Sequence, residues 1–371
     1  MKFGLQGIRS VLNSTGNPHT SFSSIHIAGT NGKGSTASMI AAMLTAAGYK
    51  TGLYTSPHVV DFTERIRING KPIRQRDVVE ILRKLKPLVQ RNRTTFFETV
   101  TAMAFHYFAQ RKVDIAVIET GLGGRLDASN VIEPLISVIT TIGLDHTEIL
   151  GKTISKIASE KAGIIKPGIP CVIGVREPVA RQVIKKIARL RSSALFRASA
   201  KTKIISSGIN GTRFDIKTEH THFKKLKLSL AGKHQVTNAI LALKTIQHLS
   251  TIETIHVPES AIRKGLARVQ LYSGLQSRLS IVHRNPLIIA DVAHNPDAVS
   301  ALVRSLQDVR MNSVILVFGV SADKDFLRMV QLLKPIVDRA IVVSAKTERA
   351  RRTRDIVQAL TEQHIPAEVE I

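Results

Sequence analysis

Apolar runs alternate with glycine-bearing turns and helical stretches along most of the chain. Each run is rich in β-branched residues and is followed by a turn, and after the first run the stretch TASMIAAMLTAAG has helical character. Strands that alternate with turns and helices are typical of a doubly wound parallel α/β sheet. The runs are almost continuously apolar, which indicates strands covered on both faces. The runs are SIHIAG (24–29), VDIAVIETG (113–121), ISVITTIG (136–143), LIIADVAH (287–294) and SVILVFGV (313–320).

The pattern changes in two places. Residues 197–230 alternate between polar and apolar positions, with Gly208 and Asn210-Gly211 as turn signals, so we expect a small antiparallel insertion there. A helix is predicted to follow over 234–249, where apolar residues recur on one face. Residues 270–277 have turn character, and a new series of strands and helices begins after them. We therefore expect two α/β domains, 1–275 and 276–371.

Length and composition agree with a two-domain cytoplasmic protein. The chain has 371 residues, and no apolar run approaches the roughly 18 residues that cross a membrane. The N-terminus lacks the long apolar segment of a secretory signal, and the single cysteine, Cys171, excludes an internal disulfide framework. We expect a monomer in the cytoplasm, with no membrane partner.

The net charge of +25 raises the question of a nucleic-acid partner. Only 4% of the residues are aromatic, however, and no basic segment interleaves the aromatic residues that would stack on bases. The basic runs 181–191, 224–227 and 349–354 are interpreted as helix faces or turns that form a solvated cationic surface. We therefore expect no nucleic-acid partner.

The stretch HIAGTNGKGST (26–36) combines glycines with a lysine, as phosphate-binding loops do. It does not fit the signature G-x-x-x-x-G-K-[ST], because Ile27 stands where the first glycine should be and Gly34 where the hydroxyl residue should be. A strand before the loop and a helix starting near Ser35 would still direct backbone N–H groups at an anion. A plain glycine turn is the alternative, but a turn of this kind does not require a lysine between two glycines. The predicted phosphate-binding residues are Thr30, Asn31, Gly32, Lys33, Gly34 and Ser35.

Further motifs occur in one order along the chain and together resemble a known family. They are AGTNGKGST, YTSPH, FTERIRING, TFFETVTA, ETGLGGRLDASN, GLDHTEILGKTISKIASEKAGIIKPG, GKHQVTNA and AHNPDA. The chain is similar to the folylpolyglutamate synthase and dihydrofolate synthase family, a branch of the Mur ligase superfamily. The resemblance implies a P-loop-type parallel-sheet ATPase domain followed by a smaller Rossmann-like α/β domain. It also accounts for the loop, which takes the shorter form G-T-N-G-K in that superfamily.

ATP chemistry requires a divalent cation, and three residues follow predicted strands where the carboxyl ends of parallel strands meet. Glu119 ends one apolar run, His146 follows another, and Ser56 follows TGLY. Each alone is as well explained by a structural role. The resemblance implies that Ser56, Glu119 and His146 bind Mg²⁺, with two ions expected. It also marks Lys161 as a lysine that reacts with carbon dioxide to form a carbamate, with Lys166 as the alternative. Lys33, Lys161, His146 and Glu119 are thus the predicted catalytic residues.

The resemblance also implies the sites for the other substrates. A flat pterin would lie at TFFE and GGRLDAS, for which the alternative is core phenylalanines and a turn aspartate. The base and ribose of ATP would be held by Asn238, Arg278 and Asp291, while His294 and Asn295 would contact glutamate or phosphate. The predicted pterin-site residues are Thr95, Phe96, Phe97, Glu98, Leu126, Asp127 and Ala128.

The chain departs from the family pattern at two positions and at its end. Ser280 replaces an acidic residue, and Val292 replaces a glycine whose backbone freedom it would restrict. The chain also ends at VEI, earlier than the family pattern, so we expect a shortened second domain.

These features predict an ATP-dependent ligase. It would phosphorylate a carboxylate of dihydropteroate, or of the terminal glutamate of a folate, and the amine of L-glutamate would displace the phosphate. Three alternatives remain: another Mur-type amide ligase, a non-catalytic member of the family, and a basic nucleotide-dependent protein that binds nucleic acid.

Overall fold

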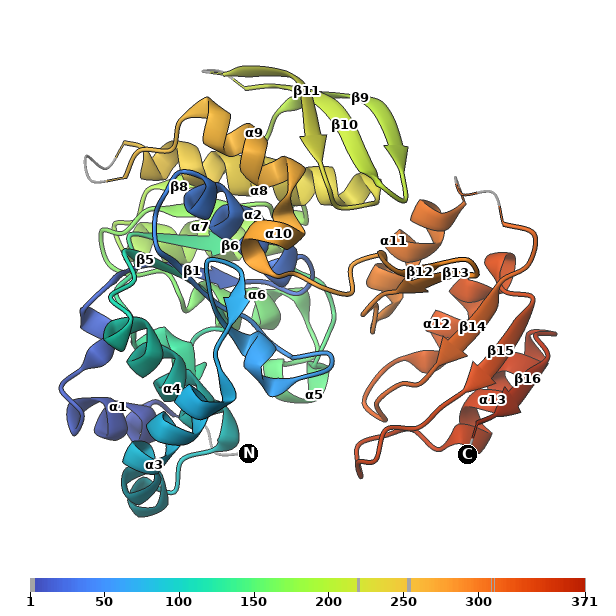
Figure 1. Cartoon of the computed structure of the whole chain (residues 1–371), viewed down its shortest axis with the longest axis horizontal. Helices are drawn as coiled ribbons and strands as arrows, with labels where there is room; N and C mark the ends of the chain where they lie inside the picture. The colour runs from blue at the N-terminus through green and yellow to red at the C-terminus, as the bar shows by residue number, and fades with distance from the viewer. Residues whose placement is uncertain (1–3, 219–220, 252–254, 308, 310, 371) are drawn as a thin grey trace. The chain divides into compact units, whose positions relative to one another are not determined.

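The chain folds into two compact units, and the computed structural model describes residues 4–218, 221–251, 255–307, 309 and 311–370 (Figure 1). The first unit comprises Met1–Ile205, Arg213–Ser229 and Gln235–Gln276. The second comprises Ser277–Ile371 together with the two short segments Ser206–Thr212 and Leu230–His234.

The first unit is built on an eight-stranded sheet in the order β4-β3-β2-β5-β1-β6-β7-β8. The six strands from β2 to β8 in this order are parallel, and β3 and β4 extend one edge as antiparallel strands. β5 is buried along its whole length, as expected for a strand covered on both faces. The sequence therefore predicted the class of this sheet correctly. The strands are β1 Ser23–Ala28, β2 Thr51–Tyr54, β3 Ile66–Ile68, β4 Lys71–Pro72, β5 Ile115–Glu119, β6 Ile136–Ile139, β7 Cys171–Ile173 and β8 Leu195–Arg197.

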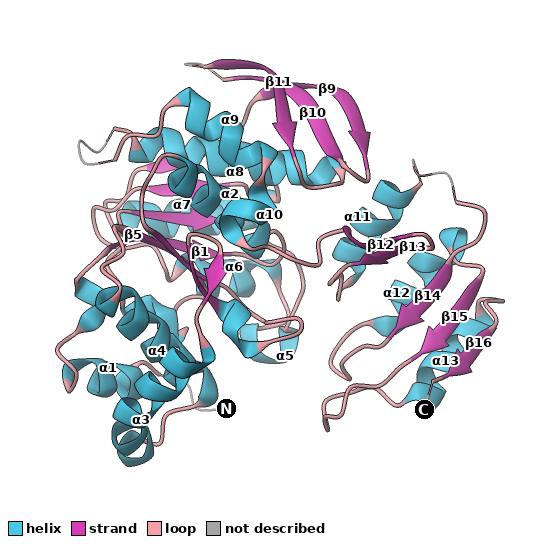
Figure 2. Ribbon diagram, in the orientation of Figure 1, coloured by secondary structure: helices cyan, strands magenta, loops and turns pink. Residues whose placement is uncertain are grey.

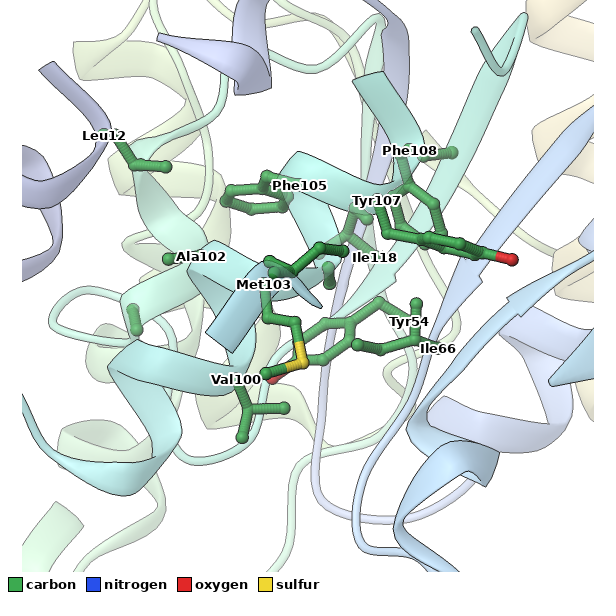
Figure 3. Packing of buried hydrophobic residues seen from close by; sticks show 14 of the residues in the cluster. Leu12, Tyr54, Ile66, Val100, Ala102, Met103, Phe105, Tyr107, Phe108 and Ile118 are labelled. Atoms are coloured by element: carbon green, nitrogen blue, oxygen red, sulfur yellow. The ribbon is translucent and has the colours of Figure 1, made fainter. Parts of the chain in front are cut away.

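Helices cover this sheet (Figure 2). Large apolar side chains pack between the helices and the sheet. On one face, Phe105 and Phe108 of α4 pack with Tyr54 at the end of β2 and Ile118 of β5, and Leu12 of α1 joins the same cluster (Figure 3). α2 contacts β5, β2 and β1, and it also packs against α9 and α10. The helices of this unit are α1 Gln6–Asn13, α2 Lys33–Ala46, α3 Gln75–Asn92, α4 Phe96–Gln110, α5 Thr147–Leu150, α6 Ile154–Ala162, α7 Pro178–Leu190, α9 Glu259–Ala267 and α10 Val269–Ser273; short 3₁₀ helices are η1 Pro18–Thr20, η2 Phe62–Arg65 and η3 Ala128–Val131.

A separate three-stranded sheet in the order β11-β10-β9 forms where the sequence predicted an insertion. Its strands are β9 Lys201–Gly208, β10 Gly211–Lys217 and β11 His222–Leu228, and α8 Lys233–Leu249 follows as predicted. β9 lies at the edge of this sheet, and Ile204 and Ile205 on it are 40% and 49% exposed beside the exposed Lys201 and Lys203.

Two local predictions in this part of the chain are wrong. The basic residues 224–227 belong to strand β11, because their alternation with buried Phe223, Leu226 and Leu228 suits a half-buried strand better than a helix or turn. Residues 269–273 form helix α10 instead of a turn. The buried Val269 anchors this helix, and Gly274, with φ of 72°, ends it in the left-handed conformation that favours glycine.

The described residues of the second unit include a three-stranded parallel sheet and the helices α11, α12 and α13. The sheet has the order β14-β15-β16, and a core that includes Met329 and Val342 lies against it. The elements are β14 Ile315–Phe318, β15 Arg339–Val342, β16 Ala367–Val369, α11 Pro296–Leu306, α12 Phe326–Leu333, α13 Thr353–Glu362 and the 3₁₀ helix η4 Lys334–Ile336.

The run LIIADVAH does not join that parallel sheet, contrary to prediction. Its first four residues form β13 Leu287–Ala290, which pairs antiparallel with β12 Ser280–Arg284. The intervening Asn285-Pro286 is a short turn that brings the two strands together locally, so a hairpin forms without a helical crossover.

Candidate functional site

Four neighbouring parallel strands deliver the predicted site residues to one edge of the large sheet. β2, β5, β1 and β6 are adjacent in that order. Ser56 follows β2, Glu119 is the last residue of β5, the glycine loop follows β1, and His146 follows β6. The carboxyl edge of a parallel sheet is the usual position of an α/β site. The structure therefore brings these residues to one edge, although their chemical roles remain predictions.

The glycine loop lies between β1 and α2, and a pair of threonines after β6 holds it. Asn31 N–H donates to Thr141 Oγ1 at 3.0 Å, and the Thr140 and Thr141 hydroxyls donate to the Asn31 carbonyl at 2.7 and 3.1 Å. Thr30 Oγ1 accepts a hydrogen bond from Gly143 N–H at 3.0 Å. Sequence reasoning missed Thr140 and Thr141; their signal was the two polar residues at the end of the apolar run ISVITTIG.

Gly32 leaves no room for a side chain. It has φ of 82°, and a Cβ atom at this position would lie 2.5 Å from Asn238 Oδ1. The Asn238 amide also donates to Gln235 Oε1 at 2.9 Å, so its orientation is set from within α8. The structure thus places Asn238 directly against the loop, where we expect the nucleotide.

Lys33 and Lys161 converge on the same loop atom. Lys33 is the first residue of α2, and its Nζ donates to the Gly29 and Thr30 carbonyls at 3.1 and 3.3 Å. Lys161 lies in the last turn of α6, is 4% exposed, and donates to the Gly29 carbonyl at 2.8 Å. Burial and the nearby positive charge of Lys33 lower the pKa of Lys161 to about 7. The lowered pKa increases the fraction of Lys161 that is a neutral amine near neutral pH.

Lys166, the alternative to Lys161, has a different environment. Its Nζ donates to the Asn130 carbonyl at 2.9 Å, after the end of α6. Its pKa is also lowered, chiefly by burial, but its contact is with the turn at 128–131 and not with the glycine loop.

Glu119 and Ser56 lie next to each other. Glu119 is 3% exposed, and its Oε2 accepts a hydrogen bond from Ser56 N–H at 3.2 Å. His146 is the residue immediately before α5 and has a left-handed conformation, and its N–H donates to Asp145 Oδ1 at 3.0 Å. Within the part of the chain that the structure describes, no group of three or more His, Cys, Asp or Glu side chains is placed to bind a metal.

That donor set still fits Mg²⁺. This ion usually keeps several waters and takes only one or two carboxylates together with substrate phosphates. The Glu119 carboxylate and the neighbouring Ser56 could supply oxygen ligands of this kind, and the loop beside them is suited to phosphates.

Thr95 and Glu98 form a reciprocal cap at the start of α4. Glu98 N–H donates to Thr95 Oγ1 at 3.2 Å, and Glu98 Oε2 accepts from Thr95 N–H at 2.8 Å. Glu98 Oε1 also accepts from Ile8 N–H at 3.2 Å, which ties α1 to α4. The carboxylate has a structural role here, and its predicted contact with substrate stays a prediction.

Phe96 and Phe97 point in different directions. Phe97 packs beside Tyr54, with ring centroids 6.1 Å apart, and its ring would collide with any side chain at Gly121. Phe96 is 62% exposed, and the guanidinium of Arg65 lies 5.6 Å from its ring centroid. An exposed aromatic ring with a cation over it can accept a flat ligand, so Arg65 is a candidate that sequence reasoning missed.

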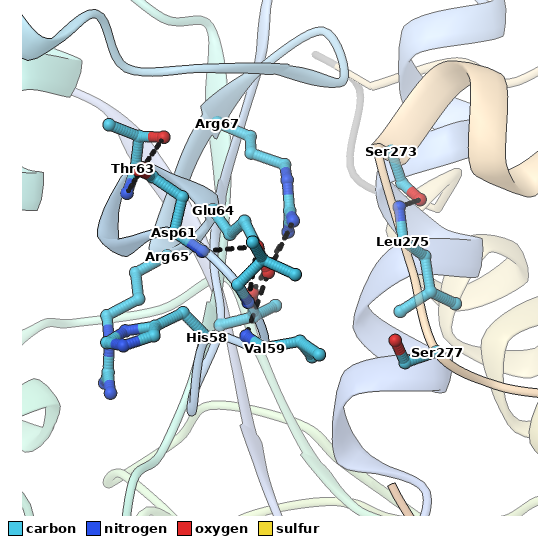
Figure 4. A network of polar contacts seen from close by, with 12 residues as sticks. His58, Val59, Asp61, Thr63, Glu64, Arg65, Arg67, Ser273, Leu275 and Ser277 are labelled. Atoms are coloured by element: carbon cyan, nitrogen blue, oxygen red, sulfur yellow. Dashed lines mark hydrogen bonds and ion pairs between the residues drawn. The ribbon is translucent and has the colours of Figure 1, made fainter. Parts of the chain in front are cut away.

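Arg65 belongs to a polar network that shapes the segment after Ser56 (Figure 4). Its Nε donates to His58 Nδ1 at 2.8 Å. Glu64 accepts hydrogen bonds from the N–H groups of Val59, Val60 and Asp61 at 3.0, 2.9 and 2.8 Å. One carboxylate therefore fixes three consecutive backbone groups of an otherwise exposed turn.

Leu126, Asp127 and Ala128 lie in the segment after β5. Asp127 is buried and accepts from Leu122 N–H at 2.9 Å through Oδ2 and from Ser129 N–H at 3.0 Å through Oδ1. Burial raises its pKa, while these hydrogen bonds oppose the rise. The segment is pressed against α6, since a Cβ atom at Gly124 would lie 2.7 Å from the Lys161 carbonyl oxygen.

The remaining predicted residues lie in the second unit. Asp291 accepts from Leu279 N–H and Ala293 N–H, both at 2.8 Å, and Arg278 donates to the Ser277 carbonyl at 3.0 Å. His294 Nδ1 lies 2.9 Å from the Val292 carbonyl oxygen, and Asn295 caps α11 by accepting from Ala298 N–H at 2.9 Å. Their roles toward ATP or glutamate stay predictions.

The two departures from the family pattern fit their surroundings. Ser280 Oγ accepts a hydrogen bond from Arg278 N–H at 3.2 Å. Val292 is not among the described residues with positive φ, so its backbone does not need the freedom of glycine.

Comparisons with known proteins agree with this architecture. Residues 27–246 match the Mur ligase middle domain, and residues 277–371 match the Mur ligase glutamate ligase domain. The chain is 38% identical over 370 residues to the dihydrofolate synthase/folylpolyglutamate synthase of Bacillus subtilis, covering 97% of this chain and 85% of that protein.

Solved structures show the same similarity. The ADP complex of Mycobacterium tuberculosis folylpolyglutamate synthase superimposes with a TM-score of 0.90 at 33% identity, covering 99% of this chain and 84% of that one. Escherichia coli FolC in complex with DHPP and ADP gives a TM-score of 0.86 at 29% identity, covering 100% of this chain and 85% of that one. None of the helices that the structure describes is long and apolar enough to span a membrane.

Proposed function

Because the chain belongs to the Mur ligase superfamily, and within it to the dihydrofolate synthase and folylpolyglutamate synthase family, we propose that it is an ATP-dependent ligase. It joins L-glutamate to dihydropteroate, to the terminal glutamate of a folate, or to both. The observation that carries the proposal is the convergence of Lys33 and Lys161 on the Gly29 carbonyl, at the sheet edge where Glu119 ends β5.

In the reaction, the acceptor carboxylate attacks the γ-phosphorus of ATP, and ADP leaves. The resulting acyl phosphate is attacked by the amine of glutamate, which expels phosphate, loses a proton and leaves an amide bond. Lys33 neutralises charge on the transferring phosphoryl group, and the N–H groups of the glycine loop orient it. Ser56, Glu119 and His146 would hold Mg²⁺, which would supply further charge neutralisation at the phosphates.

Lys161 is suited to carbamate formation. Its neutral amine can attack the carbon of carbon dioxide and release one proton, which converts the neutral side chain into a carbamate anion. Burial and the charge of Lys33, which lower its pKa to about 7, make the reactive neutral form available. We place the pteroyl group against Phe96, Phe97 and the segment 126–128, and the nucleotide against the loop and Asn238. Arg278 and Asp291 would complete the nucleotide site, and His294 would contact glutamate.

We further propose that the protein acts as a cytoplasmic monomer in which residues 1–275 bind ATP and acceptor and 276–371 form the second catalytic domain. Its single cysteine, Cys171, is buried in β7, which suits a reducing compartment.

An activity assay tests the function directly. Purified protein is supplied with Mg-ATP, L-glutamate and either dihydropteroate or tetrahydrofolate, and ADP release and glutamylated product are measured. We expect both signals to require the acceptor and glutamate, and the Lys33→Ala variant to give neither. Absence of ADP and of product with both acceptors would refute the proposal, and comparison of the acceptors shows which activities are present.

A further inference from the structure

His26 is a buried histidine in the strand that leads to the glycine loop. It lies in the middle of β1, three residues before Gly29, and is 0% exposed. Its Nε2 lies 2.8 Å from Ser129 Oγ, and the Ser129 hydroxyl donates to Asp127 Oδ1 at 2.5 Å. A chain of hydrogen bonds therefore runs from β1 to the segment after β5.

The Asp127 carboxyl group determines which atoms donate in these hydrogen bonds. The Asp127 carboxyl group accepts hydrogen bonds from the backbone N–H groups of Leu122 and Ser129. It also accepts one from the Ser129 hydroxyl. The serine oxygen must then accept from His26, which requires a proton on Nε2. Nδ1 of the neutral ring is left as an acceptor, and it is buried without a hydrogen-bond partner within the described part of the chain.

An unpartnered buried nitrogen reduces stability, so packing alone gives little reason for a histidine at this position. An apolar side chain of similar volume would avoid that cost. What the histidine provides is a donor at Nε2 for Ser129, which in turn orients Asp127. Asp127 bonds to Leu122 and Ser129, so it closes the segment that carries Leu126 and Ala128.

We propose that His26 is a positioning residue for the acceptor substrate, which through Ser129 and Asp127 fixes the segment 121–129 that contacts the pteroyl group. This inference rests on the proposed function, because that segment contacts a pteroyl group only if the protein uses one. In this proposal, β1, the strand that leads to the glycine loop, also supports the acceptor site.

Steady-state kinetics of His26→Leu, His26→Gln and Ser129→Ala test the inference. Leucine removes the donor, whereas the amide nitrogen of glutamine can reach the position of Nε2. We expect His26→Leu and Ser129→Ala to raise the KM for the acceptor about three- to tenfold, as loss of one hydrogen bond does, and to leave the KM for ATP within about twofold. His26→Gln should restore most of the acceptor KM.

A double variant separates a shared pathway from independent damage. If His26 acts through Ser129, His26→Leu with Ser129→Ala should raise the acceptor KM no more than either change alone. Additive effects, or equal increases in both KM values, would overturn the inference. If His26→Leu does not fold, Ser129→Ala decides alone: an acceptor-specific increase supports the inference and an unchanged acceptor KM overturns it.

The same data keep this inference apart from the proposed function. An inactive wild-type protein refutes the proposed function, and with it the inference. An active wild-type protein whose His26→Leu variant has unchanged KM values refutes the role of His26 and leaves the ligase assignment intact.

Discussion

Lys33 and Lys161 donate hydrogen bonds to the same carbonyl oxygen, that of Gly29, from helices α2 and α6. Burial, and after it the positive charge of Lys33, lowers the pKa of Lys161. Nucleotide phosphates would offer Lys33 a stronger acceptor than a backbone carbonyl. We therefore expect phosphate binding to draw Lys33 away from Gly29 and to leave this carbonyl to Lys161.

The lowered pKa of Lys161 makes stability depend on pH. In the folded protein the pKa of Lys161 is about 7, against 10.5 for an unperturbed lysine, so the unfolded chain binds more protons between these pH values. Stability from this group is therefore lowest below pH 7 and rises as the pH increases toward 10.5. Urea unfolding in buffers free of carbon dioxide should show a steeper rise for wild type than for Lys161→Met. An equal rise of stability with pH in the two proteins would contradict a lowered pKa at Lys161.

Carbon dioxide should control activity if Lys161 forms the carbamate. Protein kept in degassed buffer should lose most of its ligase activity and recover it when bicarbonate is added. Lys166→Met is the matched control, because Lys166 also has a lowered pKa but contacts Asn130 instead of the loop. We expect this control to keep its response to bicarbonate and Lys161→Met to be inactive under both conditions. A bicarbonate response in Lys161→Met would assign the carbamate elsewhere.

Substitution of Glu119 should lower kcat much more than substitution of Ser35. Glu119→Gln keeps an acceptor for Ser56 N–H but removes the negative charge proposed to hold Mg²⁺. Loss of one such charge-stabilising group should lower kcat by at least about a hundredfold. Ser35 is not among the proposed metal ligands, so Ser35→Ala should lower kcat by less than about fivefold. Equal losses would show that the loop hydroxyl binds the metal, as in the standard signature.

A side chain at Gly32 should disturb nucleotide binding, and Gly48 provides the control. Both have positive φ, 82° and 99°, but a Cβ atom at Gly32 would meet Asn238 whereas at Gly48 nothing lies within 4 Å. Each alanine variant should lose about 1 kcal/mol of unfolding free energy from the left-handed backbone. Only Gly32→Ala should also weaken ATP binding, which titration with a fluorescent nucleotide would measure. Similar nucleotide affinities for the two variants would show that the contact with Asn238 is unimportant.

The sequence predicted the positions of the candidate site residues best where the ends of strands determine them. Glu119 ends β5 and the glycine loop follows β1, and because parallel strands align their ends, both positions follow from the apolar runs. Thr140 and Thr141 were missed because their value lies in bonds to Asn31, which is more than a hundred residues earlier in the chain. The run ISVITTIG shows two polar residues near its end, but it does not show the distant residue to which they bond.

Two other sequence patterns, TFFE and LIIADVAH, are each compatible with two structural interpretations. TFFE was interpreted as a pterin site, yet a threonine followed three residues later by glutamate is also the pattern of a capping box, and the structure contains one. LIIADVAH was interpreted as a parallel strand from its apolar content. Its pairing with β12 depends on the short turn before it, which apolar content cannot reveal.

The exposed edge strand β9 has a consequence for self-association. Ile204 and Ile205 present apolar surface beside backbone groups that another extended chain could bind. Lys201 and Lys203 place like charges at the same edge, so two copies that approach strand to strand would repel each other. Part of the excess positive charge thus acts as a barrier to aggregation, and this barrier weakens as salt screens the lysines.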